Sequence, residues 1–220
     1  MVLLDDAIYE ETKKIVLGKS KRSPMLIEFS DWFMRVFSVK VLNVEFGKIK
    51  HSKTNRYRLY VIIENTEGYR KMYLEYFKPK EEYQRQIADE FYRISLKYQL
   101  ATEEQLENLF VIYNDFSEEA KSEANWKAAK EVREFVKKKY PVAWDVLAMF
   151  SSSVVFYFLD SDIAANESKG ISEAIANDYY SILKKYDDLN YFTRENIHLK
   201  FDSKENLDKN YKGNFLFYSR

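Results

Sequence analysis

The sequence predicts an α+β fold, in which helices pack on a mixed sheet that has an antiparallel N-terminal meander and two pseudo-repeated strand-helix-strand units. Three observations predict it. Apolar residues recur at helical spacing in some segments and alternate in others. Glycine and proline are scarce, at 5 and 3 residues, which favours long regular elements over irregular loops. A helical segment and the strand after it recur in the second half of the chain.

Two helices are predicted within residues 1–40. The first carries apolar residues between Leu4 and Val16 at helical spacing and ends near Gly18. The second begins at Ser23-Pro24, because serine is a preferred N-cap and proline a preferred first helical residue. Both helices should bury one face.

A change to alternating apolar residues at position 41 predicts an antiparallel meander. Its strands cover residues 41–50, 56–65 and 69–77, and a turn at 65–68 joins the last two. After the meander, helical spacing predicts a helix that begins beyond Pro79, and a strand follows at 109–116.

The second half continues with alternating helices and strands. A charged helix should end at Pro141, since proline lacks the N–H that a helix interior needs. The further expected elements are a buried helix at 142–150, a strand at 153–160, a helix at 171–186, and strands at 196–202 and 214–220.

An internal repeat links the two halves. Residues 86–98 align without gaps with residues 174–186, so that Tyr92 matches Tyr180. The strands that follow keep this register, and 60–65 matches 157–162 across a shorter connection. Self-similarity of this kind is meaningful when the flanking elements repeat as well. The sequence therefore predicts pseudo-repeat units at about 56–116 and 153–202 within a single compact domain, 1–220.

Composition bounds the classes of function. The chain has 220 residues, no net charge and no cysteine, which excludes disulfide frameworks, thiolate zinc sites and thiol nucleophiles. No glycine-rich phosphate loop or dinucleotide fingerprint is present, so no cofactor and no metal are predicted. Asp5 and Asp6 stand where a signal peptide needs positive charge, and the longest apolar run is too short to span a bilayer. We expect a cytoplasmic protein that is not inserted in a membrane.

Acidic residues at the ends of predicted strands are the candidate catalytic residues. Carboxylates that converge at the carboxyl edge of a sheet can hold Mg²⁺ or Mn²⁺ for phosphoryl chemistry. The same residue types also cap helices and form turns, without any ligand. The candidates are Glu64, Asp115, Asp160, Asp162 and Asp202.

The predicted order of helix, three strands, helix and strand resembles the core of the PD-(D/E)xK nuclease superfamily. That resemblance implies metal-dependent cleavage of nucleic acid, with Glu64, Glu75 and Lys78 as the matching residues. Glu75 and Lys78 are separated by one residue more than the family motif has.

A second candidate site is a basic hairpin between the first two predicted strands. Cations next to tyrosine rings can contact phosphates and stack on bases, or bind an acidic protein. Lysines at sheet edges also prevent strands from pairing between molecules. The cations are Lys48, Lys50, Lys53, Arg56 and Arg58.

The sequence favours a non-enzymatic protein-binding module, of the accessory, inhibitor or immunity type. Its 18 tyrosines and 3 tryptophans suit an interface, and the charge is unevenly spread along the chain. The partner is expected to be a protein, although nucleic acid remains open, and the sequence leaves the oligomeric state undetermined. The alternative is a metal-dependent phosphodiesterase or nuclease that uses the strand-end carboxylates and the basic hairpin.

Overall fold

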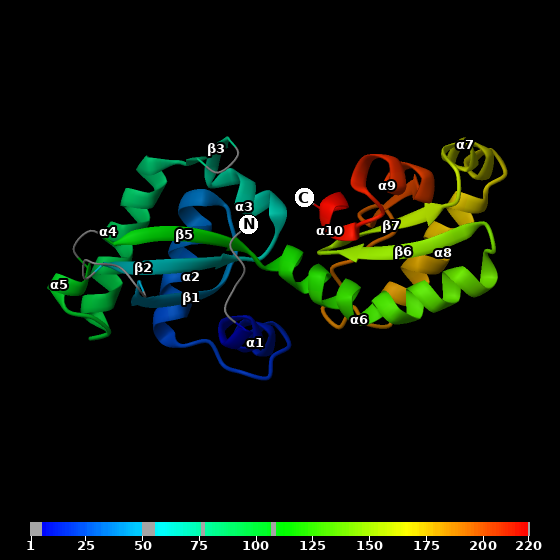
Figure 1. Ribbon diagram of the computed structural model, residues 1–220. Coiled ribbons are helices and arrows are strands. Elements are labelled where there is room, and N and C mark those ends of the chain that lie inside the picture. Colours follow the sequence, from blue (N-terminus) through cyan, green and yellow to red (C-terminus); the bar gives the residue numbers. More distant parts are fainter. Residues whose placement is uncertain (1–5, 50–55, 76–77, 107–108, 220) are drawn as a thin grey trace. The chain divides into compact units, whose positions relative to one another are not determined.

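The computed structural model describes residues 6–49, 56–75, 78–106 and 109–219 as helices, strands and connections (Figure 1). The chain divides into two compact units, Met1–Ser117 (unit 1) and Glu118–Arg220 (unit 2). The predicted α+β class, with helices packed on mixed sheets, is confirmed. That the whole chain forms a single domain stays a prediction.

Unit 1 begins with two helices and then alternates strands and helices. Its elements are α1 (Asp6–Val16), α2 (Pro24–Phe37), β1 (Val41–Lys48), β2 (Tyr57–Ile63), α3 (Thr66–Lys71), β3 (Tyr73–Glu75), β4 (Lys78–Pro79), α4 (Glu81–Lys97), α5 (Glu103–Leu106) and β5 (Phe110–Asp115). β1 pairs antiparallel with β2, which pairs parallel with β5.

Unit 2 repeats this order of strands. Its elements are α6 (Phe116–Lys139), whose first two residues belong to unit 1, then β6 (Ala143–Met149), β7 (Ser152–Tyr157), α7 (Asp160–Ser168), α8 (Ile171–Leu183), β8 (His198–Ser203), α9 (Lys204–Tyr211) and α10 (Phe215–Tyr218). β6 pairs antiparallel with β7, which pairs parallel with β8. The two sheets therefore have the same strand order and directions.

The first strand of each sheet is irregular at the same place. In β1 the register with β2 shifts between Val41 and Asn43, and in β6 the register with β7 shifts between Ala143 and Asp145. A bulge of this kind adds one residue to a strand and breaks the alternation of its side chains. Asn43 and Asp145 thus occupy corresponding positions, which supports the predicted pseudo-repeat.

The pairing corrects one part of the predicted alignment. Ile63 lies opposite Asp115, and Tyr157 lies opposite Ser203. Asp115 and Ser203 match in the predicted repeat, so Ile63 corresponds to Tyr157. The predicted match of 60–65 with 157–162 is therefore wrong by three residues, because it followed side-chain likeness rather than backbone pairing.

A pair of helices covers one face of each sheet. In unit 1, Phe29 of α2 and Phe91 of α4 pack against Val61 of the central strand, and their rings meet edge to face at 5.9 Å. In unit 2, Val132 of α6 and Tyr179 of α8 pack against β7 in the same way. The opposite face of this second sheet is covered by α9 and α10.

A carboxylate links the two helices in each unit. Glu28 of α2 accepts hydrogen bonds from Lys97 Nζ (2.5 Å) and from Tyr98 Oη (3.0 Å). Glu131 of α6 accepts corresponding bonds from Lys185 and Tyr186, the residues that match Lys97 and Tyr98 in the repeat. The two helix pairs are thus held by the same set of side chains.

The predicted third strand of the meander, 69–77, is wrong in its first part and in its pairing, since of its described residues only Tyr73–Glu75 form a strand, β3, which pairs with β4 and not with β2. Residues 66–71 form α3, because the Asn65 side chain accepts a bond from Gly68 N (2.9 Å) and so caps a helix instead of forming a hairpin turn. Gly68 is needed for close packing, since a Cβ there would lie 3.0 Å from Val39 and from Ile63. Within the described residues, α3 and the two short strands β3 and β4 stand in place of that strand, so the order of elements differs from that of the nuclease core. Glu75 and Lys78 stand 4.0 Å apart on two short strands.

Five further elements differ from their predictions. Residues 143–149 form β6 and not a helix, since the bulge at Asp145 hides the alternation that marks a strand. Residues 215–218 form α10, which Asn214 caps by accepting a bond from Leu216 N (2.8 Å), and not a strand. α5, α7 and α9 are additional helices.

The remaining predicted elements are confirmed in type. The cap at Ser23 is present, with Leu26 N donating to Ser23 Oγ at 3.2 Å. In the described part of the chain, none of the helices combines the length and the apolar character that crossing a lipid bilayer requires.

The side chain of Asn125 joins α6 to the turn between β6 and β7 and is fully enclosed. It donates to Phe150 O (2.8 Å) and Ser152 O (2.7 Å) and accepts from Tyr179 Oη (2.8 Å). We expect Asn125→Ala to lower the free energy of unfolding by roughly 2–4 kcal/mol, because the Phe150 and Ser152 carbonyls and the buried Tyr179 hydroxyl lose their partner. Tyr179→Phe removes one hydroxyl and should cost about 1 kcal/mol. Denaturant titrations of both variants check this order, and equal losses would contradict it.

The pKa of the Glu28 carboxyl is lowered to about 2 by the hydrogen bond from Lys97 and next by that from Arg93. A lowered pKa means that this carboxylate stabilises the fold above its ordinary pKa of 4.5, and that the contribution disappears as the pH falls towards about 2. We therefore expect the difference in stability between the wild type and Glu28→Gln to be largest well above pH 4.5 and to shrink steadily as the pH falls from about 4.5 towards about 2. Unfolding curves over this range measure it, and a difference that grows on acidification would refute it.

Candidate protein-binding groove

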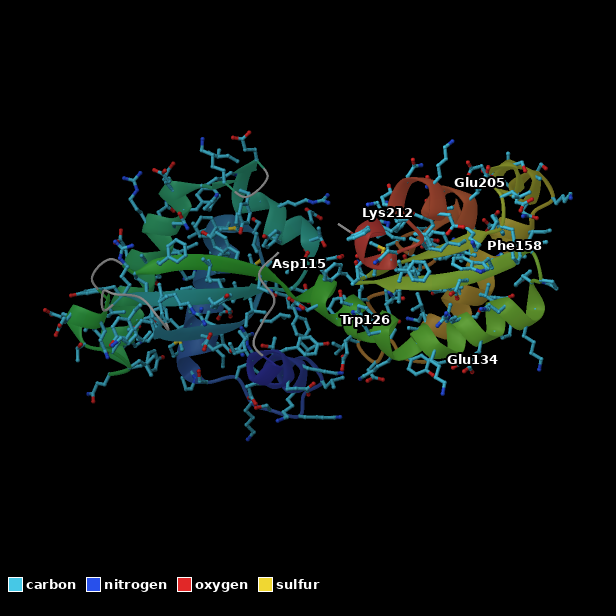
Figure 2. All side chains as sticks on the ribbon, viewed as in Figure 1. Asp115, Trp126, Glu134, Phe158, Glu205 and Lys212 are labelled. Atoms are coloured by element: carbon cyan, nitrogen blue, oxygen red, sulfur yellow. The ribbon has the colours of Figure 1, made fainter. Side chains whose placement is uncertain are left out.

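A groove of about 840 Å³ runs along unit 2 between the helix α6 and the strand β6. We call it the α6–β6 groove. Figure 2 marks Trp126 and Glu134 on α6. The groove is lined by Trp126, Ala129, Lys130, Arg133, Glu134, Lys137 and Lys138 of the helix and by Val146, Leu147 and Ala148 of the strand.

The sequence of α6 explains its wall of the groove. Ala124, Ala128, Val132 and Val136 recur every four residues and are buried in the core of unit 2. The next ridge of the same helix points away from that core and carries the cations and Trp126. Trp126 is unusually exposed for so large an apolar side chain, since 57% of the residue is accessible to solvent.

The strand β6 supplies the other wall. Within its sheet β6 pairs only with β7, so β6 is an edge strand and its other backbone edge makes no ladder. Val146, Leu147 and Ala148 present mainly apolar groups to the groove. Exposed edges of this kind are protected in many proteins, and here the cations of α6 stand beside the edge.

An ion pair joins the two walls. Arg133 donates from Nε and from Nη2 to the two carboxylate oxygens of Asp145, each at 2.5 Å, and Lys137 Nζ lies 3.8 Å from the same carboxylate. Asp145 is 4% exposed and also accepts a bond from Val146 N (2.9 Å). The hydrogen bond to Asp145 raises the pKa of Arg133. The pair thus fixes the helix against the strand at the bulge.

The groove carries an excess of positive charge. Four cations and one acid, Glu134, line it, and Asp145 neutralises only part of this charge. Lys130 and Lys138 are exposed and form no ion pair with any described residue. An apolar floor, an exposed aromatic ring and free cations together make a surface that suits a negatively charged protein.

The predicted catalytic carboxylates each hold part of the fold. Glu64 binds Lys40 at 2.6 Å, and Asp115 Oδ1 accepts bonds from the N–H (3.1 Å) and the hydroxyl (2.7 Å) of Ser117. Both belong to unit 1. Asp115 therefore caps the start of α6.

The other three candidates belong to unit 2. Asp160 accepts a bond from the Ser203 hydroxyl, and Asp162 accepts one from Leu159 N (2.9 Å). Asp202 accepts bonds from Tyr218 Oη (2.6 Å) and from the neighbouring Asn206 amide. Among the described residues, no group of three histidine, aspartate or glutamate side chains is arranged to hold a metal ion. Catalysis by these carboxylates stays a prediction.

The predicted basic hairpin is described only in part. Lys50 and Lys53 lie outside the described residues. The Arg58 guanidinium lies 4.6 Å from the centre of the Tyr60 ring and 4.0 Å from Glu45. Lys48 and Arg56 flank the hairpin end. Its role in binding anions or partners stays a prediction.

Sequence reasoning missed the α6–β6 groove, although a signal was present. Lys130, Arg133, Lys137 and Lys138 recur at the three- and four-residue spacing that places side chains on one helical face. The adjoining strand could not be recognised, because residues 143–149 were expected to be helical. The sequence therefore allowed only the helical wall of the groove to be predicted.

A comparison of the chain with known protein families, with curated proteins and with solved structures finds no match. The function must therefore be argued from the groove itself.

The ion pair across the groove should stabilise unit 2. We expect Asp145→Ala to lower the free energy of unfolding by roughly 1–2 kcal/mol, because the Val146 N–H and the exposed Arg133 lose an acceptor. Glu134→Ala is the matched control on the same wall and should stay within about 0.5 kcal/mol of the wild type. Thermal and denaturant unfolding measure both variants. A loss in Glu134→Ala as large as that in Asp145→Ala would show that the pair has no special role.

Proposed function

We propose that this chain is a non-enzymatic protein-binding module of the accessory, inhibitor or immunity type, which acts in the cytoplasm and binds its partner in the α6–β6 groove. The observation that carries the proposal is the exposed Trp126 ring beside the apolar strand β6 and four cations.

The Trp126 side chain supports binding energetically. Tryptophan is enriched among the few residues that supply most of the energy of a protein interface. Covering a side chain of this size releases water from apolar surface and contributes on the order of 2 kcal/mol. The free protein gains nothing from leaving the ring exposed, so a partner that covers it is the simplest explanation.

The cations support a choice of partner. Lys130 and Lys138 form no ion pair with any described residue, so an acidic surface that approaches the groove meets unpaired positive charge. Complementary charge speeds the encounter of two proteins and excludes partners of the same sign. The partner is therefore an acidic protein.

Two further observations support a binding module and its location. Each of the five predicted catalytic carboxylates is engaged in a cap, an ion pair or a side-chain hydrogen bond of its own unit. The absence of cysteine means that a reducing compartment has no thiol or disulfide of this chain to alter.

The proposal is tested by capture of the partner from the native lysate on immobilised protein, with groove variants. We expect Trp126→Ala to weaken capture at least about tenfold, and Lys130→Glu with Lys138→Glu to weaken it similarly, since both remove contacts from the centre of the interface. Circular dichroism checks that the variants are folded.

Lys200→Glu with Lys209→Glu is the matched control, because it makes the same change of charge at exposed positions of β8 and α9. A protein retained by the wild type and by this control, but lost by the groove variants, supports the proposal. If every variant retains the same proteins equally, the groove is not the binding site.

A further inference from the structure

In unit 1 a helix of the same chain covers the edge strand that corresponds to β6. α1 contacts β1 (Figure 1), and Asn43 Nδ2 donates to Thr12 Oγ1 at 3.0 Å. Thr12 is fully buried, although it belongs to a helix of which most residues are at least partly exposed. α1 therefore docks beside β1 near its bulge, and its Tyr9 ring also packs on Phe116, which follows β5, at 5.3 Å.

The connection between α1 and α2 completes this cover. Arg22 donates from Nη2 to the hydroxyl of Ser30 on α2 and to Val41 O (3.3 Å) at the start of β1. In unit 1, both α2 and β1, which correspond to the two walls of the groove, are thus hydrogen-bonded to the N-terminal segment.

The repeat identifies the corresponding residues in unit 2. Asn43 and Asp145 follow equivalent bulges, and each side chain accepts a bond from the next backbone N–H at 2.9 Å. Glu28 and Glu131 hold equivalent bonds, so that Ser30, two residues after Glu28, corresponds to Arg133.

In unit 2 the side chains at these two positions bind each other, and neither bonds to an additional helix. Arg133 pairs with Asp145, whereas Ser30 and Asn43 pair with the segment of α1. α6 is continuous with the segment that leaves β5, so within the described residues no separate helix precedes it to take the place of α1. Val146 and Leu147 line the α6–β6 groove, which no described element of unit 2 fills.

We infer that the α6–β6 groove binds an amphipathic helix of the partner, which docks where α1 docks on unit 1 and carries acidic residues along its side facing α6. This inference rests on the proposed function and specifies the partner. The apolar side of such a helix covers Trp126 and β6, and its acids meet Lys130, Lys137 and Lys138.

Charge argues against α1 of a second copy as the occupant. The last turn of α1 carries Lys13 and Lys14. In the groove these side chains would face further cations, whereas Ser30 and Asn43 on unit 1 are uncharged. A helix with acids in their place fits the groove better.

An extended strand paired to the free edge of β6 is the competing mode of binding. The helix is favoured because β1, the strand that corresponds to β6, is contacted by a helix within the same chain. The two modes predict different patterns in a bound peptide, since a helix has a period of 3.6 residues and a strand a period of two.

The experiment selects random 16-residue peptides by display on the full-length protein, with counter-selection on Trp126→Ala/Lys130→Glu/Lys138→Glu. The selected peptides are synthesised, and fluorescence anisotropy measures their affinity for the wild type, the groove variant and Lys200→Glu/Lys209→Glu. A synthetic peptide with the sequence of α1 is the comparator. Circular dichroism reports whether a peptide becomes helical when it binds.

We expect peptides with apolar residues at three- and four-residue spacing and an excess of Asp and Glu, which become helical and lose affinity at least about tenfold on the groove variant alone. Groove-dependent peptides that alternate like strands, or an α1 peptide that binds as tightly as the acidic ones, would overturn the inference and leave the proposed function standing. If no selected peptide depends on the groove residues, both fall.

Discussion

The buried central strands β2 and β7 impose the constraint on which the rest of the structure depends. Nearly every residue of these strands is enclosed, so each three-stranded sheet must be covered on both faces. In unit 2, α6 and α8 cover one face, and α9 and α10 cover the other. α6 packs on one face of this sheet, so it does not also extend over the backbone edge of β6. The α6–β6 groove results because no further described element of unit 2 covers that edge.

Corresponding positions in the two units make the same contacts at one place and different contacts at another. The Glu28 and Glu131 carboxylates tie the helices together by nearly identical bonds. At the bulge the solutions diverge, since Asn43 is neutral and bonds to α1, whereas Asp145 is charged and binds Arg133. A buried carboxylate needs a strong partner, and the guanidinium supplies two parallel hydrogen bonds. The walls of the groove are thereby fixed before any partner arrives, which reduces the entropy lost on binding.

Much of the fold was predictable, and the errors have identifiable causes. The N-cap at Ser23 and the strand around Val154 follow from local chemistry, because capping and apolar runs are properties of short segments. Asn65 was misread because the same residue type begins both turns and helices, and only the contact of Gly68 with Val39 and Ile63 decides between them. The α6–β6 groove was not predicted for the same reason, since it depends on contacts between residues distant in the chain. Lys130 and Lys138 show a helical face, but nothing in their neighbourhood of the chain reveals the strand that lies beside it.

The sequence by itself determined the class of the fold, the positions of most helices and the likeness of the two halves, because these depend on periodicity and composition along short stretches. Only the tertiary structure decided that residues 143–149 form an edge strand, that Arg133 and Asp145 join the helix and the strand of the groove, and that the strand-end carboxylates cap helices and bind neighbouring side chains. These features depend on residues distant in the chain, whose meeting is set by strand pairing and by the packing of helices on sheets.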